Sequence, residues 1–182
     1  HTLMATAMDA AGNGSTSASV TVTVSNPGAA AYDATLKVPV CTTPSSYCDS
    51  VTLLANRGSP SEAHTPNTLD GCADGTATFY PGTSTAIERI RVYRPDGTNL
   101  AAGKRVRIDV TVNALSPNRE GVDLYYTSDA AHPSWTYLTT LGQGNYGSQT
   151  LSTEYRLPSG SVQAVRASYW FSTHTQSPCS VS

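Results

Sequence analysis

The chain has 182 residues, a formal net charge of −2 and a charged fraction of 13%, about half of the roughly 25% found in average proteins. No basic surplus is present to neutralise a phosphate backbone, and no apolar run approaches the roughly 20 residues of a membrane helix. We therefore expect neither a nucleic-acid partner nor a membrane partner.

The first segment, residues 1–26, is predicted to form a hairpin. Residues 2–8 alternate polar and small apolar side chains, residues 9–14 form a turn cluster, and residues 19–24 place every Val on one face. Because an isolated hairpin is marginally stable in water, we expect it to pack on another part of a protein.

A short linker is predicted at residues 27–32, where Pro27 and Gly28 end the strand and small residues follow. The remainder, residues 33–182, is predicted to be one domain. Its expected strands are 33–39, 51–54, 76–80, 86–94, 104–114, 122–128, 135–140, 148–156 and 162–171. Closely spaced strands separated by turn signals indicate an all-β fold, an antiparallel β-sandwich or jelly roll.

Cysteine usage indicates an oxidising compartment, and hence a secreted, extracellular protein. Four cysteines allow three connectivities, of which we favour Cys41–Cys48 and Cys72–Cys179. In the chain-entropy model the short loop contributes about 2–3 kcal/mol and the long loop about 4–5 kcal/mol. A zinc site is the alternative, but no paired Cys-x-x-Cys is present.

Two resemblances follow from local motifs. The His-Thr-Leu start, the Asp-Ala-Ala-Gly-Asn turn and the Val-Thr-Val-Thr-Val ending of residues 1–26 resemble the last strands of a bacterial immunoglobulin-like domain. Roughly residues 34–179 resemble a C-terminal accessory module of secreted myxobacterial and actinobacterial peptidases and related hydrolases. The stretches that carry this resemblance are 48–50, 52–54, 66–68, 72–76, 88–92, 96–99, 103–109, 123–126, 133–138 and 157–167.

The resemblance implies a non-catalytic module, joined to the catalytic domain of a parent hydrolase, that binds polysaccharide or insoluble protein substrate. Related modules continue past the last cysteine into an Asp-rich stretch and one more strand, whereas this sequence stops at Ser182. We therefore expect that strand, and any ligand-binding residue that it supplies, to be missing here.

The segment around Cys72 is the densest in polar side chains and is a candidate Ca²⁺ site. Its candidate ligands are Glu62, Asn67, Asp70 and Asp74. Calcium takes six to eight oxygens, and the Asp-Gly pairs allow loop carbonyls to converge. Residues 67–71 also resemble the calcium loop of discoidin-type, galactose-binding-like jelly rolls. The alternative is a pair of plain Asp-Gly turns stapled by Cys72.

Aromatic residues are the candidate ligand-binding side chains, because sugar faces stack on exposed rings. Trp135 and Trp170 lie in predicted strands, and Tyr80, Tyr93 and Tyr146 lie near turn signals. The alternative is that most of these rings fill the core between two sheets.

No catalytic residue is predicted, because neither a Gly-x-Ser-x-Gly elbow nor a His-Glu-x-x-His motif is present. The sequence leaves three further alternatives open: a calcium-dependent lectin, a structural spacer, and a copper-dependent lytic polysaccharide monooxygenase. In the last, His1 would bind copper with His64, His132 or His174. Unpaired strand edges in residues 1–26 also predict a possible strand-swapped homodimer.

Overall fold

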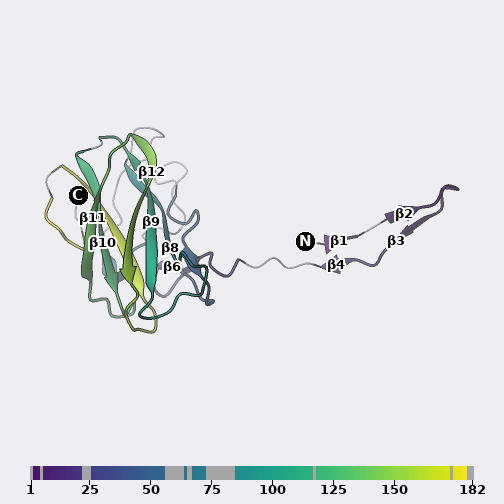
Figure 1. The fold of residues 1–182 in the computed structure, drawn as a ribbon, viewed down its shortest axis with the longest axis horizontal. Helices are drawn as coiled ribbons and strands as arrows, with labels where there is room; N and C mark the ends of the chain where they lie inside the picture. Colours follow the sequence, from purple (N-terminus) through teal and green to yellow (C-terminus); the bar gives the residue numbers. More distant parts are fainter. Residues whose placement is uncertain are drawn as a thin grey trace.

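The computed structural model describes residues 2–4, 6–21, 26–55, 64, 67–72, 85–116, 118–172 and 174–179. Within them the fold is all-β, with two antiparallel sheets packed as a β-sandwich, as the sequence predicts (Figure 1).

The two sheets of the sandwich contain four and three strands. The order in the first is β12-β9-β8-β7, and in the second β11-β10-β13. Their bounds are β7 Tyr47–Asp49, β8 Ala86–Tyr93, β9 Arg105–Ala114, β10 Glu120–Thr127, β11 Thr136–Gly142, β12 Gly147–Arg156 and β13 Ala164–Phe171. The connections β9–β10, β11–β12 and β12–β13 pass from one sheet to the other, so the chain closes the core at both ends of the sandwich.

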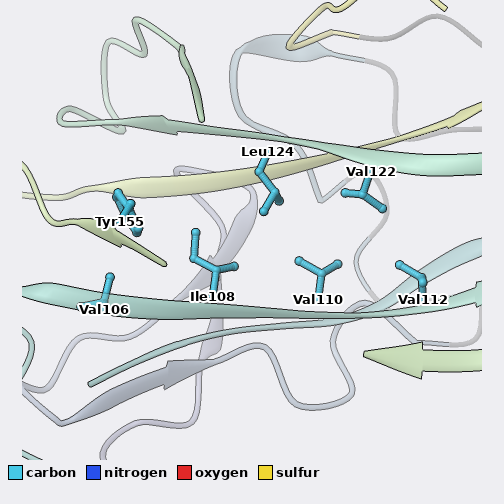
Figure 2. Packing of buried hydrophobic residues seen from close by; sticks show 7 residues of the cluster. All are labelled: Val106, Ile108, Val110, Val112, Val122, Leu124 and Tyr155. Atoms are coloured by element: carbon cyan, nitrogen blue, oxygen red, sulfur yellow. The ribbon is translucent and has the colours of Figure 1, made fainter. Parts of the chain in front are cut away.

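The core lies between β9 and β10 and depends on strict alternation along both strands. Val106, Ile108 and Val110 of β9 face Val122 and Leu124 of β10 (Figure 2), and all five are fully buried. Successive side chains of a strand point to opposite faces, so the intervening residues of β9 turn away from the core. Each fully buried aliphatic side chain contributes about 1.5–3 kcal/mol relative to an exposed one.

The N-terminal segment forms a hairpin from β1 Thr2–Leu3, β2 Thr6–Met8, β3 Gly14–Thr16 and β4 Val20–Thr21, with β1 paired to β4 and β2 to β3. Asp9 closes the turn, because its carboxylate accepts hydrogen bonds from the backbone of Ala11 and Asn13. The side chains of residues 6–19 are all exposed. That the hairpin packs on another domain or on a second copy stays a prediction.

Two of the strand predictions are wrong. Residues 33–39 contain the end of β5 Ala31–Asp33, a turn, and the start of β6 Val38–Val40. The Asp33 carboxylate accepts hydrogen bonds from the backbone N–H groups of Thr35 and Leu36, which bends the chain.

Residues 51–54 likewise form turns, because Asp49 accepts a hydrogen bond from the Val51 N–H and Leu53 N–H donates to the Ser50 carbonyl. The strand predicted at 76–80 lies outside the described residues. The six later strand predictions each overlap one of β8 to β13 and are confirmed.

The described part of the chain holds no helix with the length and hydropathy that a bilayer crossing requires.

A substitution at the centre of the core tests how much this packing contributes to the free energy of unfolding. Leu124→Ala removes a fully buried side chain between the sheets, and we expect the free energy of unfolding to fall by about 2–5 kcal/mol. Val162→Ala, at an exposed position, is the matched control, with an expected change below about 0.5 kcal/mol. Urea denaturation followed by circular dichroism measures both. Similar losses in the two variants would contradict this assignment of the core.

Candidate functional site

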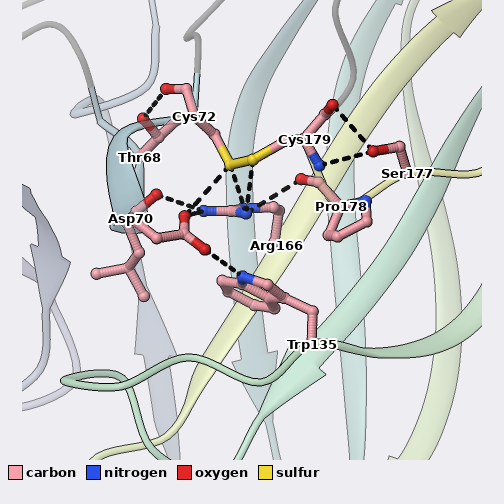
Figure 3. The surroundings of a disulfide bond; sticks show 9 residues. Thr68, Asp70, Cys72, Trp135, Arg166, Ser177, Pro178 and Cys179 are labelled. Atoms are coloured by element: carbon pink, nitrogen blue, oxygen red, sulfur yellow. Dashed lines mark hydrogen bonds and ion pairs between the residues drawn. A yellow bond between two sulfur atoms is a disulfide. The ribbon is translucent and has the colours of Figure 1, made fainter.

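Both disulfides favoured from the sequence are present, and each joins two backbone segments. Cys41–Cys48 spans 7 residues, with its Cα atoms 5.8 Å apart. Cys72–Cys179 spans 107 residues, with its Cα atoms 5.2 Å apart, and ties residues 67–72 to the C-terminal segment 174–179. These two segments lie over the outer face of the three-stranded sheet (Figure 3).

Arg166 of β13 is the centre of the cluster around the second disulfide (Figure 3). Its side chain is 9% exposed, and its Nη2 donates to the Asp70 carboxylate at 2.7 Å and to the Leu69 carbonyl at 2.8 Å. Its Nη1 donates to the Pro178 carbonyl at 3.1 Å, and its guanidinium stacks 4.1 Å from the Trp135 ring centroid. The buried charge is therefore compensated from both covering segments and from an aromatic face.

The candidate calcium ligands are only partly described. Both Asp70 oxygens have partners within the protein, since Oδ1 accepts from Arg166 and Oδ2 accepts from Trp135 Nε1 at 2.8 Å. Asn67 donates through Nδ2 to the Leu53 carbonyl at 3.3 Å. Glu62 and Asp74 lie outside the described residues. Calcium binding here stays a prediction.

Asp70, Cys72 and Cys179 form the one group of metal-ligand residue types that the described residues bring together. Both sulfurs are bonded to each other, so neither is the thiolate that a metal requires. This group is consequently a disulfide with a neighbouring carboxylate.

Trp170, the second predicted binding tryptophan, lies on the same outer sheet face and is also packed within the protein. Its ring stacks on His174 at 4.1 Å between centroids, and it covers Gly121, where any Cβ would collide with the ring. His174 Nε2 lies 2.9 Å from an oxygen of Asp123, which is 1% exposed. Thr140 donates to the other Asp123 oxygen at 2.6 Å. Trp135 and Trp170 thus both have packing partners within the protein while staying partly exposed, and ligand binding by either stays a prediction.

Tyr93 projects from the outer face of the four-stranded sheet beside Arg91 and Tyr47. The Arg91 guanidinium lies 4.6 Å from the Tyr93 ring centroid and 5.3 Å from that of Tyr47. The ring of Tyr47 in turn packs against Gly28, where a side chain would collide. Tyr93 and Tyr47 thus both make cation–π contacts with Arg91. Tyr93 lies on the four-stranded sheet, whereas the two tryptophans lie against the three-stranded sheet.

Tyr146 is the described candidate that the fold leaves open to solvent, with 76% of its surface exposed. It lies between β11 and β12, in a loop held by a 2.7 Å hydrogen bond from Gln149 Nε2 to the Asn145 carbonyl. Phe171, 50% exposed, closes β13 at the same end, because its strand partner is Glu120 at the start of β10. Phe171 was not among the predicted ligand-binding residues, because an aromatic residue at the end of a strand carries no sequence signal that distinguishes an exposed ring from a buried one. Tyr80 lies outside the described residues.

A buried polar group underlies this end of the sandwich. Glu120 is 1% exposed, and its Oε2 accepts hydrogen bonds from the Tyr169 hydroxyl at 2.6 Å and from the Leu115 N–H at 3.0 Å. The Glu120 carbonyl also accepts from the backbone N–H of Gln143 at 3.4 Å. These bonds connect Glu120 to the β9–β10 and β11–β12 connections, so the start of the loop that carries Tyr146 is hydrogen-bonded to β10.

The histidines that are described have separate partners. His64 stacks on Tyr32 at 4.2 Å, His132 contacts Asp129 at 3.3 Å, and His174 contacts Asp123. His1 lies outside the described residues, so the copper alternative stays untested.

Comparison with known proteins found no matching family model, curated protein or solved structure.

The Asp70–Arg166 pair leads to a stability prediction. Asp70→Ala leaves a buried guanidinium without its carboxylate, and we expect a loss of about 2–3 kcal/mol in unfolding free energy with EDTA present. Glu154→Ala, which removes the partner of the exposed Arg105, is the control, with an expected loss below about 1 kcal/mol. Urea denaturation measures both. A wild-type midpoint that rises with Ca²⁺, and does so only when Asp70 is present, would instead show cation binding by this carboxylate.

We expect the folded protein to lose stability at alkaline pH, because three tyrosines have raised pKa values. Burial, followed by the nearby Asp123 charge, raises the pKa of Tyr125 to about 12, and burial also raises the pKa of Tyr155 and Tyr169 above the ordinary value of 10.0. Because the folded pKa values exceed the unfolded ones, their contribution is complete below pH 10 and is lost as the pH rises through the folded values.

Tyrosinate absorbance measured together with circular dichroism should show these tyrosines ionising only as the sheet signal is lost. Tyr146→Phe, at an exposed position, should leave the alkaline midpoint unchanged. Full tyrosine ionisation near pH 10 with native circular dichroism would contradict the prediction.

Proposed function

We propose that the sandwich is a non-catalytic module that holds polysaccharide or protein substrate for a secreted bacterial hydrolase. The observation that supports this is the exposure of two aromatic side chains, Tyr146 and Phe171, at the same end of the sandwich. They have the largest exposed fractions among the large apolar residues described in the two sheets and their connections.

The end that carries these rings suits a polymer rather than a small molecule. Tyr146 projects from the β11–β12 connection and Phe171 from the last position of β13, and both side chains are exposed to solvent. Arg119 lies 5.0 Å from the Phe171 ring centroid and adds hydrogen-bond donors beside it. Exposed aromatic side chains beside donors bind sugar rings or apolar protein side chains through stacking and hydrogen bonds.

The loop geometry supports binding without a large ordering cost. The Gln149–Asn145 hydrogen bond and the Asn118 N–H bond to the Gln143 carbonyl, at 3.0 Å, hold the loop before ligand arrives. A loop ordered in advance loses less conformational entropy on binding.

Secretion and the role in a hydrolase are part of the same proposal. Two disulfides form and persist in oxidising compartments, which supports an extracellular location. A tethered module raises the effective concentration of a catalytic domain at its substrate without taking part in the chemistry.

Retention on insoluble polymers tests the proposal. Cellulose, chitin, peptidoglycan and collagen are each incubated with the protein, and the bound fraction is measured across a concentration series. We expect Tyr146→Ala and Phe171→Ala each to weaken retention about tenfold, or about 1.4 kcal/mol.

Val162→Ala is the control, because Val162 is 44% exposed and lies in the β12–β13 connection at the opposite end. It should retain wild-type binding. Absence of retention on every polymer, or retention that neither aromatic substitution changes, would overturn the proposal in favour of a spacer.

A further inference from the structure

A row of arginines crosses the outer face of the four-stranded sheet. In the strand register Arg156 faces Arg105, Arg107 faces Tyr93, Arg91 faces Asp109, and Arg89 faces Thr111. The five arginines therefore run diagonally over β12, β9 and β8. We call this set, Arg89, Arg91, Arg105, Arg107 and Arg156, the arginine stripe.

The stripe faces solvent because its strands alternate. On β9 the buried Val106 and Ile108 separate Arg105 and Arg107, so both arginines project away from the core. Cross-strand neighbours lie about 5 Å apart and diagonal neighbours about 7–8 Å apart. The stripe thus brings arginines from three neighbouring strands together on one sheet face.

In each ion pair of this face the arginine is more exposed than its carboxylate. Asp49, which pairs with Arg89, is 5% exposed, whereas Arg89 is 47% exposed. Asp109 is 22% exposed beneath Arg107 at 44%. Glu154, which pairs with Arg105 and faces Arg107, is itself 43% exposed, so what favours an anion here is the excess of five guanidinium groups over the three carboxylates with which they pair.

Among the arginines of the stripe that pair with a carboxylate, Arg91 has the longest contact, and its side chain is 39% exposed. Its Nε is buried without a hydrogen-bond partner among the described residues, and its nearest carboxylate oxygen, on Asp49, is 3.8 Å away. The rings of Tyr47 and Tyr93 hold its guanidinium in place. A fixed planar guanidinium is suited to bidentate recognition of carboxylate or sulfate.

We propose that the arginine stripe binds an acidic polysaccharide, through carboxylate or sulfate groups that repeat along a sugar chain. The positive charge of the stripe complements the anionic groups that repeat along such a chain. The chain as a whole has a net charge of 11 − 13 = −2, so this attraction is local to the face. The surface is separate from the Tyr146–Phe171 end and does not depend on the function proposed above.

Affinity electrophoresis and calorimetry with soluble polymers test this inference. Polygalacturonate carries carboxylates, heparin carries sulfates, and amylose is neutral. We expect binding to at least one acidic polymer, no binding to amylose, and affinity that falls as salt is raised to about 0.15 M. Comparing polygalacturonate with heparin identifies the anionic group.

The test variant is R91Q/R107Q, and we expect it to weaken binding at least about tenfold. The matched control, K37Q/K104Q, removes the same charge at two residues outside the stripe and should stay within about twofold of wild type. Circular dichroism melts check that both variants fold. The Tyr146→Ala/Phe171→Ala variant should bind normally, which separates this surface from the end site.

Three results would overturn the inference. The first is that neither acidic polymer binds the wild-type protein. The second is equal weakening in R91Q/R107Q and K37Q/K104Q, which would indicate net charge alone. The third is equally tight binding to duplex DNA, which would indicate unselective attraction to any polyanion.

Discussion

The alternation of side chains along β9 is the constraint on which the rest of the sandwich depends. This strand lies between β8 and β12, and its fully buried aliphatic side chains meet those of β10 across the core. The residues between them, including Arg105, Arg107 and Asp109, must then face solvent. A slip of one residue would bury these charges and expose the valines, so the register of the core also sets the composition of the outer face.

The second sheet has the opposite arrangement, because its outer face is covered. Asp123, Tyr125 and Arg166 all lie on that face, and each is less than 10% exposed. The Cys72–Cys179 disulfide holds the covering segments in place, and Arg166 bonds to both of them. A polar sheet face thereby becomes a buried, hydrogen-bonded layer, in which each charge has a partner that offsets its desolvation.

This asymmetry determines where ligands can bind. The tryptophans pack against the covered layer, where Trp135 stacks on Arg166 and Trp170 on His174, although each stays partly exposed. The two surfaces proposed to bind ligand are the end with Tyr146 and Phe171 and the outer face of the four-stranded sheet. The two surfaces differ in chemistry, since one presents aromatic rings and the other presents guanidinium groups.

The sequence by itself determined the all-β class, the strands from β8 to β13 and the favoured disulfide pairing. Alternation and turn residues are local signals, and they dominate where a strand has one buried face. The strand predictions for residues 33–39 and 51–54 were wrong because the carboxylates of Asp33 and Asp49 accept hydrogen bonds from backbone N–H groups two residues further on, which bends the chain. Only the tertiary structure decided that Asp70 bonds to Arg166 and Trp135, and that arginines from three strands form one row. Those contacts join residues far apart in the chain, and the strand register and the covering loops that create them leave no local pattern in the sequence.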